Sequence, residues 1–168
     1  MKKFRLVTAA SSAVLALTLT ACGVDSAPEA GDAPGDDPVT LTNCGAQVTF
    51  DRTPERGVLL KSATVPYLHE LGILGEVITA RAGAYARDYY DDETWAELES
   101  IPMLSEKIDS SGHLQISKEV VLAQKPDVVF GEADNLNRDT LGAAGIPLLE
   151  EPGLCPDPPS DPSFDDIH

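Results

Sequence analysis

The sequence predicts an α/β fold: a Rossmann-like lobe in which a mostly parallel sheet is flanked by helices. Short apolar runs typical of buried strands alternate with helical segments of about 8–12 residues between positions 57 and 149. Glycine, proline and capping residues separate these runs, so that strand and helix signals follow each other in regular order. Parallel strands need helical crossovers, and continuous apolar strands are typical of a sheet covered on both faces.

Residues 47–80 predict a hairpin arm, two strands and a helix. Polar and apolar residues alternate at 47–50, as in a hairpin arm, and the continuous apolar run 57–60 indicates a buried strand. A helix should follow with Pro66 in its first turn, because proline fits there, and the glycines after residue 71 favour its end. The apolar run 77–80 is the next predicted strand.

The second half repeats this order. Ser117 is a suitable N-cap, and Pro126 ends the helix that Ser117 begins. The other elements are assigned from apolar spacing and length: helices at 92–98 and 135–144, and strands at 102–104, 127–130 and 146–149.

The N-terminal residues have the order of a bacterial secretory signal. Three basic side chains precede an uncharged, mostly apolar stretch that is shorter than the roughly 18–20 apolar residues that span a bilayer. The stretch ends in Leu19-Thr20-Ala21-Cys22, which is similar to a lipobox. We expect residues 1–21 to be a lipoprotein signal peptide and Cys22 to carry a lipid at the extracytoplasmic face of the cell membrane. The alternative is an ordinary signal peptide with a chance cysteine.

The composition is strongly acidic. The chain has 12 Lys and Arg against 28 Asp and Glu, a net charge of −16, and loss of residues 1–21 removes three bases and no acid, which leaves −19. Nucleic acid is therefore not an expected partner, because phosphate binding needs Lys and Arg. Anionic headgroups would repel the surface, so the lipid is the expected membrane contact.

Residues 22–42 are predicted to be the lipidated cysteine and a disordered acidic tether. Residues 23–38 read GVDSAPEAGDAPGDDP, in which Val24 is the only large apolar side chain. The rest of the chain, 43–168, is long enough for one domain with one hydrophobic core.

Two cysteines remain once Cys22 is lipidated. In an exported protein, Cys44 and Cys155 are most simply interpreted as a disulfide. The bond would close a loop of about 110 residues around the folded region. Free thiols or a metal-binding pair are the alternatives.

Several motifs resemble the iron-siderophore and cobalamin class of solute-binding proteins of ABC importers. The most specific is KEVVLAQKPDVV at 118–129, which is similar to the family pattern S-x-E-x-V-L-A-L-x-P-D-L-V. Weaker likenesses occur in the expected order: residues 43–56 resemble the hairpin that opens the domain, 71–77 a helix-to-strand turn, 144–147 an A-G-I-P segment, and 163–166 the start of the helix that joins two lobes.

The resemblance implies that residues 43–168 are the N-terminal lobe of a class III periplasmic-binding-protein fold, with the second lobe absent. In that family, ligand lies in the cleft between two lobes, and both lobes dock on a permease. We therefore expect a ferric-siderophore receptor for iron uptake, truncated here, that is not an enzyme and holds no cofactor. Cobalamin or haem as ligand, or a one-lobe protein-interaction module, are the alternatives.

Candidate ligand contacts follow from the rule that ligands gather at the carboxyl ends of strands in open α/β sheets. Residues 81–90 contain two Arg and three Tyr, which suit carboxylate or catecholate oxygens and flat ligand groups. Alternatively, Arg87 pairs with Asp88 or Asp91 and the tyrosines pack the lobe. The predicted ligand-binding residues are Lys61, Ser62, Arg81, Tyr85, Arg87, Tyr89, Lys107 and Glu132.

No motif in the sequence indicates an enzyme or a metal centre. A nucleophile elbow, a phosphate-binding glycine loop and zinc-ligand spacing are all absent from the sequence. His69 lies within a predicted helix and is expected to be a packed or surface residue rather than a ligand. His113 lies in a predicted loop, where ligation of a metal or haem is an alternative to a surface role.

Overall fold

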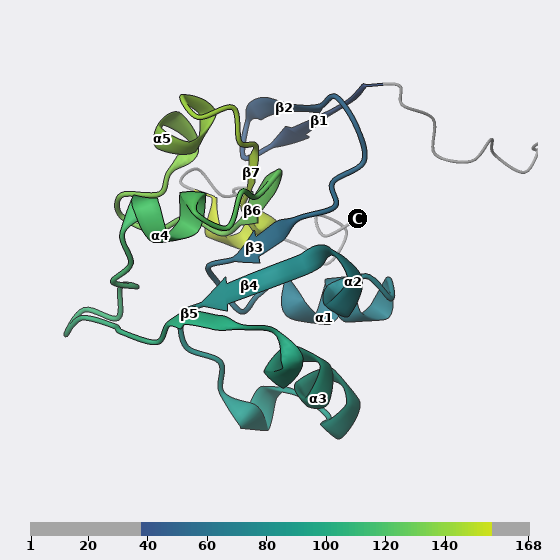
Figure 1. Ribbon diagram of the computed structural model, residues 1–168, viewed down its shortest axis with the longest axis vertical. Helices are drawn as coiled ribbons and strands as arrows, with labels where there is room; N and C mark the ends of the chain where they lie inside the picture. Colours follow the sequence, from purple (N-terminus) through teal and green to yellow (C-terminus); the bar gives the residue numbers. More distant parts are fainter. Residues whose placement is uncertain (1–37, 156–168) are drawn as a thin grey trace, which may run out of the picture. The chain divides into compact units, whose positions relative to one another are not determined.

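Five parallel strands form one sheet in the computed structural model, which describes residues 38–155 (Figure 1). The strand order is β5-β4-β3-β6-β7, and all four pairings are parallel. The predicted α/β architecture is confirmed. The strands are β3 (Gly57–Leu59), β4 (Ile78–Ala82), β5 (Met103–Ser105), β6 (Val128–Phe130) and β7 (Leu148–Leu149).

Helices cover both faces of this sheet (Figure 1). Alternate residues of β3 point to opposite faces, so Leu59 belongs to one buried cluster and Val58 to the other. The Leu59 cluster packs under α1 (Val65–Glu70), α2 (Leu74–Val77) and α3 (Asp92–Ser100). The Val58 cluster packs under α4 (Lys118–Leu122) and α5 (Arg138–Gly142).

An antiparallel hairpin precedes the sheet and extends further toward the N-terminus than the sequence indicated. Strands β1 (Val39–Asn43) and β2 (Ala46–Phe50) are joined by Cys44 and Gly45, which have φ values of 49° and 74°. Two central residues with positive φ form the type I′ turn that suits a tight hairpin. Residues 39–42, predicted as part of the tether, are therefore paired strand.

Two contacts attach this hairpin to the end of the sheet. The Asn43 side-chain amide donates to the Glu150 carbonyl and accepts the Glu150 N–H, both at 2.8 Å. The predicted disulfide between Cys44 and Cys155 is present, with a Cα–Cα distance of 5.2 Å and a sequence separation of 111. Cys155 follows a short 3₁₀ helix at Pro152–Leu154. The hairpin is thus fixed to the segment after β7 by two hydrogen bonds between the Asn43 side chain and the Glu150 backbone and by the disulfide.

Two predicted elements have different bounds in the structure. Leu74–Val77 forms a helical turn, so β4 begins at Ile78 and continues to Ala82. The helix α5 is shorter than predicted because Asn137 caps it, together with Thr140, in a capping box.

Several sequence predictions lie outside the described residues. They concern the signal peptide at 1–21, lipidation of Cys22, the tether up to residue 37 and the likeness at 163–166 to the helix that joins two lobes. Within residues 38–155, no helix is both long enough and apolar enough to cross a bilayer.

The pair His69–Glu97 joins α1 to α3. His69 Nδ1 lies 2.6 Å from Glu97 Oε2, and the other Glu97 oxygen accepts the Gly75 N–H at 2.8 Å. The hydrogen bond to Glu97 raises the pKa of His69 above 6.5, against a smaller opposing effect of burial. The His69–Glu97 pair therefore stabilises the fold fully below the pKa that His69 has in the unfolded chain. This stabilisation is lost as the pH rises through the higher pKa that His69 has in the folded protein.

We predict that Glu97→Gln destabilises the protein more at pH 6 than at pH 9. The amide keeps an acceptor for the Gly75 N–H but removes the charge that stabilises protonated His69. Urea unfolding at both pH values measures the difference, and an NMR titration should show a lower His69 pKa in the variant. Glu99→Gln on the exposed side of α3 is the control, and equal losses at the two pH values would contradict the prediction.

Candidate functional site

A cavity of about 540 Å³ lies at the carboxyl ends of the parallel strands. All five strands contribute through the loops that follow them, as the rule for open α/β sheets predicts. The lining comes from Leu60–Ala63 after β3, Gly83 and Ala84 after β4, Ile108 and Gly112–Leu114 after β5, Glu132–Asp134 after β6, and Glu150 and Leu154 after β7.

The position of this cavity follows from the strand order. From the central strand β3 the chain moves to one side through β4 and β5, then crosses to the other side of β3 to form β6 and β7. The loops after β3 and β6 therefore diverge at a topological switch point, where a crevice opens between them. Lys61 follows β3 and Glu132 follows β6, so these two residues lie at this point.

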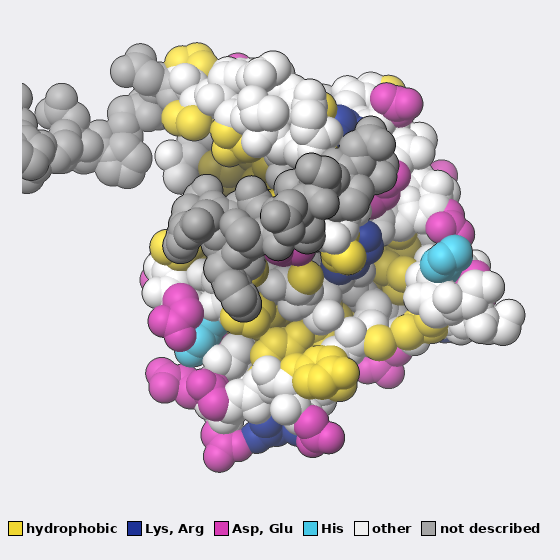
Figure 2. Space-filling view, turned by 180° about the vertical axis from the view of Figure 1, so that it is seen from behind, with side chains coloured by type: hydrophobic (Ala, Val, Ile, Leu, Met, Phe, Trp, Pro, Cys, Tyr) yellow, Lys and Arg dark blue, Asp and Glu magenta, His cyan; other side chains and the backbone are white. Residues whose placement is uncertain are grey.

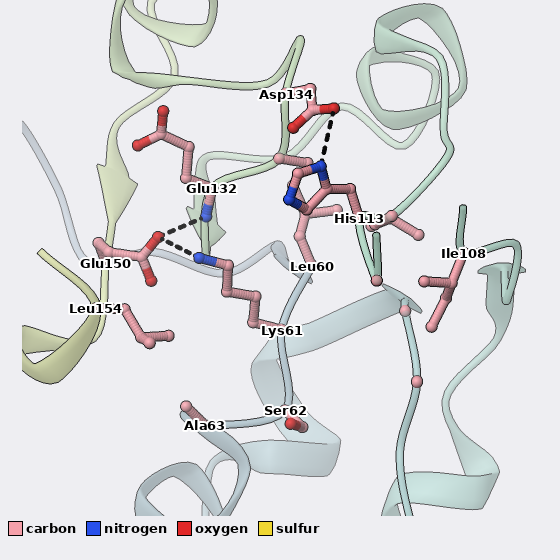
Figure 3. A pocket seen from close by; sticks show the side chains of 15 residues that line it. Leu60, Lys61, Ser62, Ala63, Ile108, His113, Glu132, Asp134, Glu150 and Leu154 are labelled. Atoms are coloured by element: carbon pink, nitrogen blue, oxygen red, sulfur yellow. Dashed lines mark hydrogen bonds and ion pairs between the residues drawn. The ribbon is translucent and has the colours of Figure 1, made fainter. Parts of the chain in front are cut away.

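A buried carboxylate organises one wall of the cavity. Glu150 is 5% exposed, and its Oε2 accepts from Lys61 Nζ at 3.0 Å and from the Glu132 N–H at 2.8 Å (Figure 3). Its Oε1 accepts the Glu151 N–H at 3.0 Å. Both oxygens therefore accept hydrogen bonds, as a buried carboxylate requires.

Gly131 allows Lys61 to lie close to the end of β6. Gly131 has a φ of 89°, in the region that favours glycine, and a Cβ built there would lie 2.9 Å from Lys61 Cβ and Cγ. The absence of a side chain at Gly131 lets the Lys61 chain pass and reach Glu150.

His113 and two aspartates form a polar cluster beside the cavity. His113 Nδ1 lies 3.6 Å from Asp134 Oδ2 and 3.9 Å from Asp109 Oδ2 (Figure 3 shows the contact with Asp134). Hydrogen bonds from the backbone N–H groups of His113 and Ser111 hold the pKa of Asp109 below its ordinary value. The three donor atoms lie within 4.8 Å of one another and could hold a metal ion, but all three residues are exposed. Water would have to complete the coordination shell.

The structure brings together three of the eight predicted ligand-binding residues. Lys61, Ser62 and Glu132 line the cavity. Arg81 does not, because it is 8% exposed, donates through Nε to the Ile101 carbonyl at 3.1 Å and lies 5.1 Å over the Tyr85 ring.

The remaining predicted residues also lie outside the lining. Tyr85 donates to the Ala82 carbonyl at 3.0 Å, and burial raises the pKa of its phenol. Arg87 pairs with Asp92 and lies 5.6 Å over the Trp95 ring, whereas Tyr89 is 80% exposed. Lys107 is exposed on the loop after β5. A contact of these side chains with ligand stays a prediction.

Sequence reasoning missed Glu150 and the His113 cluster as parts of the site. Glu150 directly follows an apolar run, and that placement could have selected it by the same rule that selected Glu132. The proximity of His113 to Asp134 had no sequence signal, because the two residues come from loops after different strands.

No family model and no curated protein sequence matches the chain, but solved structures do. A crystal structure of an ABC-type Fe³⁺-hydroxamate transport system from Saccharomonospora viridis DSM 43017 matches with 51% identity and a TM-score of 0.71, over 77% of this chain and 44% of that chain. A periplasmic binding protein from Veillonella parvula DSM 2008 matches in fold, with 22% identity and a TM-score of 0.54, over 70% of this chain and 38% of that one.

These matches confirm the resemblance seen in the sequence motifs. The chain spans less than half the length of either solved protein. Its described residues have the α/β fold of a lobe of such binding proteins.

We predict that Glu150→Gln lowers the free energy of unfolding by about 1–3 kcal/mol. Both carboxylate oxygens accept hydrogen bonds from donors, and an amide has only one acceptor atom, so one donor loses its partner. Urea unfolding at pH 7 measures the change against Glu99→Gln, an exposed acid on α3. A loss equal to that of the control would contradict the role given to Glu150.

Proposed function

We propose that this chain is the N-terminal lobe of an iron-siderophore-type solute-binding protein. Its proposed role is to bind a ferric siderophore of the hydroxamate class for an ABC importer. The observation that carries this proposal is the 51% identity to an Fe³⁺-hydroxamate transport protein over 77% of the chain. Two proteins this similar in sequence over one lobe are expected to place ligand at the same edge of the sheet.

The cavity supports this proposal by its position and composition. It lies at the switch point, and it combines apolar side chains such as Leu60, Ile108 and Leu154 with a few polar groups. Small-molecule sites commonly have this mixture. Lys61, Ser62 and Glu132 are the proposed ligand contacts in this lobe.

The proposed role is binding without chemistry. Among the described lining residues, no hydrogen bond joins the Ser62 hydroxyl to the His113 imidazole, and the one Lys is held by Glu150. Transport would be driven by the ATPase of the importer, whose permease is the proposed protein partner.

Membrane attachment through Cys22 is part of the proposal. The lipobox-like segment 19–22 supports it, and the acidic tether would separate the lobe from the membrane surface. The strongly acidic composition leaves little affinity for anionic headgroups, so the lipid would supply the attachment.

We predict that Ala84→Trp weakens binding of a ferric trihydroxamate chelate at least tenfold. Ala84 is exposed and lines the cavity, so an indole there fills space that the ligand needs without disturbing the core. Ala86→Trp is the matched control, because Ala86 is exposed on the same segment and does not line the cavity. Isothermal titration with the two variants and the parent protein measures the effect.

The same titration separates the ligand classes. Cobalamin and haem are titrated beside the ferric chelate. Tighter binding of either one, with the same sensitivity to Ala84→Trp, would replace the siderophore assignment. Equal affinities of the two tryptophan variants would show that the ligand binds elsewhere.

We predict that Cys22→Ser abolishes incorporation of labelled palmitate when the protein is produced in a bacterium with its own N-terminus. Without the thiol no lipid can be attached at residue 22. Metabolic labelling followed by immunoprecipitation measures the incorporation, with Ser26→Ala in the tether as control. Equal labelling of the Cys22→Ser and parent proteins would refute lipidation of Cys22.

A further inference from the structure

We propose that the cavity selects ferric chelates by charge: it favours cationic and neutral hydroxamate chelates over anionic ones, and Glu132 sets this preference. The inference rests on the proposed function and names the class of chelate that the same site takes. It follows from which charged groups line the cavity and which of them already have partners.

The cations near the cavity are already paired. The described residues that line the cavity include one Lys, Lys61, and no Arg. The Lys61 ammonium lies 3.0 Å from the buried Glu150 carboxylate. Binding an anion with Lys61 would leave that carboxylate without its counter-charge, which is unfavourable in a buried position. The cavity therefore has no cation in its described lining that is free for an anionic ligand.

The nearby arginines are also committed. Arg138 lines an adjacent hollow, and its guanidinium donates to the Leu148 carbonyl and to Asn43. Arg81 and Arg87 lie outside the cavity and bind carbonyl groups of Ile101 and Tyr90. This arrangement removes the basis on which the sequence suggested a site for anionic chelates.

The carboxylates are less compensated. Glu132 is partly exposed and lines the cavity, and no described residue forms an ion pair or a hydrogen bond with its carboxylate, whereas its backbone N–H binds Glu150. On the rim, His113 lies between Asp109 and Asp134 and, when protonated, offsets one of these two carboxylates. Glu132 also lines the adjacent hollow that contains Arg138, and Figure 3 shows its carboxylate pointing away from Lys61 and Ser62. Its charge therefore acts on the ligand space from the edge of the cavity, together with the charges of the rim.

The rest of the protein surface also carries negative charge. Acidic side chains are spread over the face in Figure 2, with only a few basic ones between them. The chain has 28 acidic residues against 12 Lys and Arg. A long-range field of this sign repels anionic chelates before they reach the cavity.

Ferric chelates differ in charge by chemistry alone. Three hydroxamates cancel the charge of iron(III), whereas three catecholates, each doubly charged, leave an anionic complex. A linear trihydroxamate with a terminal amine gives a cationic chelate. Acetylation of that amine makes the chelate neutral, and succinylation makes it anionic, with the same metal-binding core.

These three chelates test the proposal with one core structure. Each is titrated as its gallium(III) form into the ¹⁵N-labelled protein, because NMR shifts detect weak binding and locate it through cavity amides such as those of Gly83, Gly112 and Glu132. At low ionic strength, the amine form should bind about fivefold more tightly than the succinylated form, and the ratio should shrink as salt is added.

Glu132→Gln is the variant that tests the residue. It should reduce the ratio between cationic and anionic chelates to about twofold or less, because the charge is lost and the shape is kept. Glu99→Gln removes one acidic charge from α3, outside the cavity, and should leave the ratio as in the parent protein.

The outcomes separate this inference from the proposed function. Binding of all three chelates at the cavity with equal affinity, or with the anionic form preferred, overturns the charge selection alone. A ratio that stays at about fivefold in Glu132→Gln overturns the role of Glu132. No shift of cavity amides with any of the chelates overturns the proposed function and this inference with it.

Discussion

The carboxylate of Glu150 is the point at which separate parts of the lobe meet. It lies directly after β7 and is 5% exposed, yet it holds Lys61 from the loop after β3 and the backbone of Glu132 from the loop after β6. The backbone of the same residue binds the Asn43 side chain of the hairpin. A buried carboxylate is tolerated only when donors satisfy it, so the loops around it are constrained to positions that supply them. The shape of the cavity wall follows from this requirement.

The sheet and the cavity are related through strand order. Strands buried on both faces need helices above and below, and these helices occupy the space beside the sheet. The loops at the carboxyl ends are then the places where side chains can converge without disturbing the core. Because β4 and β6 flank β3 on opposite sides, the loops after β3 and β6 part there and leave room for a ligand.

Sequence patterns predicted most of the elements and less of the site. Continuous apolar runs located β3 and β6, and Ser117 was identified as an N-cap, which the bond from the Val120 N–H to its side chain confirms. The strand β1 was missed although Val39-Thr40-Leu41-Thr42 alternates apolar and polar residues, because these residues were assigned to the tether that precedes them. Their pairing with β2 depends on the turn at Cys44 and Gly45. Lys61 and Glu132 were predicted to lie in the site only because each follows the end of a predicted strand.

The arginines show why residue type is a poorer guide than strand position. Arg81 and Arg87 were attractive as anion ligands because their stretch contains three tyrosines. In the fold, Arg81 lies on β4 with its guanidinium against the Tyr85 ring, and Arg87 pairs with Asp92. Both use their donors to join neighbouring segments. The partner of a long cationic side chain is set by tertiary contacts, which composition does not contain.

The disulfide between Cys44 and Cys155 also has a mechanical consequence. Tension that enters the chain before Cys44 and leaves it after Cys155 passes through the sulfur–sulfur bond, because that bond is the shortest covalent path between the two points. The segment between them, with all five parallel strands, lies outside this path and is not stretched. Pulling on the two ends would peel β1 from β2 and then stop, which shields the cavity from forces transmitted along the chain.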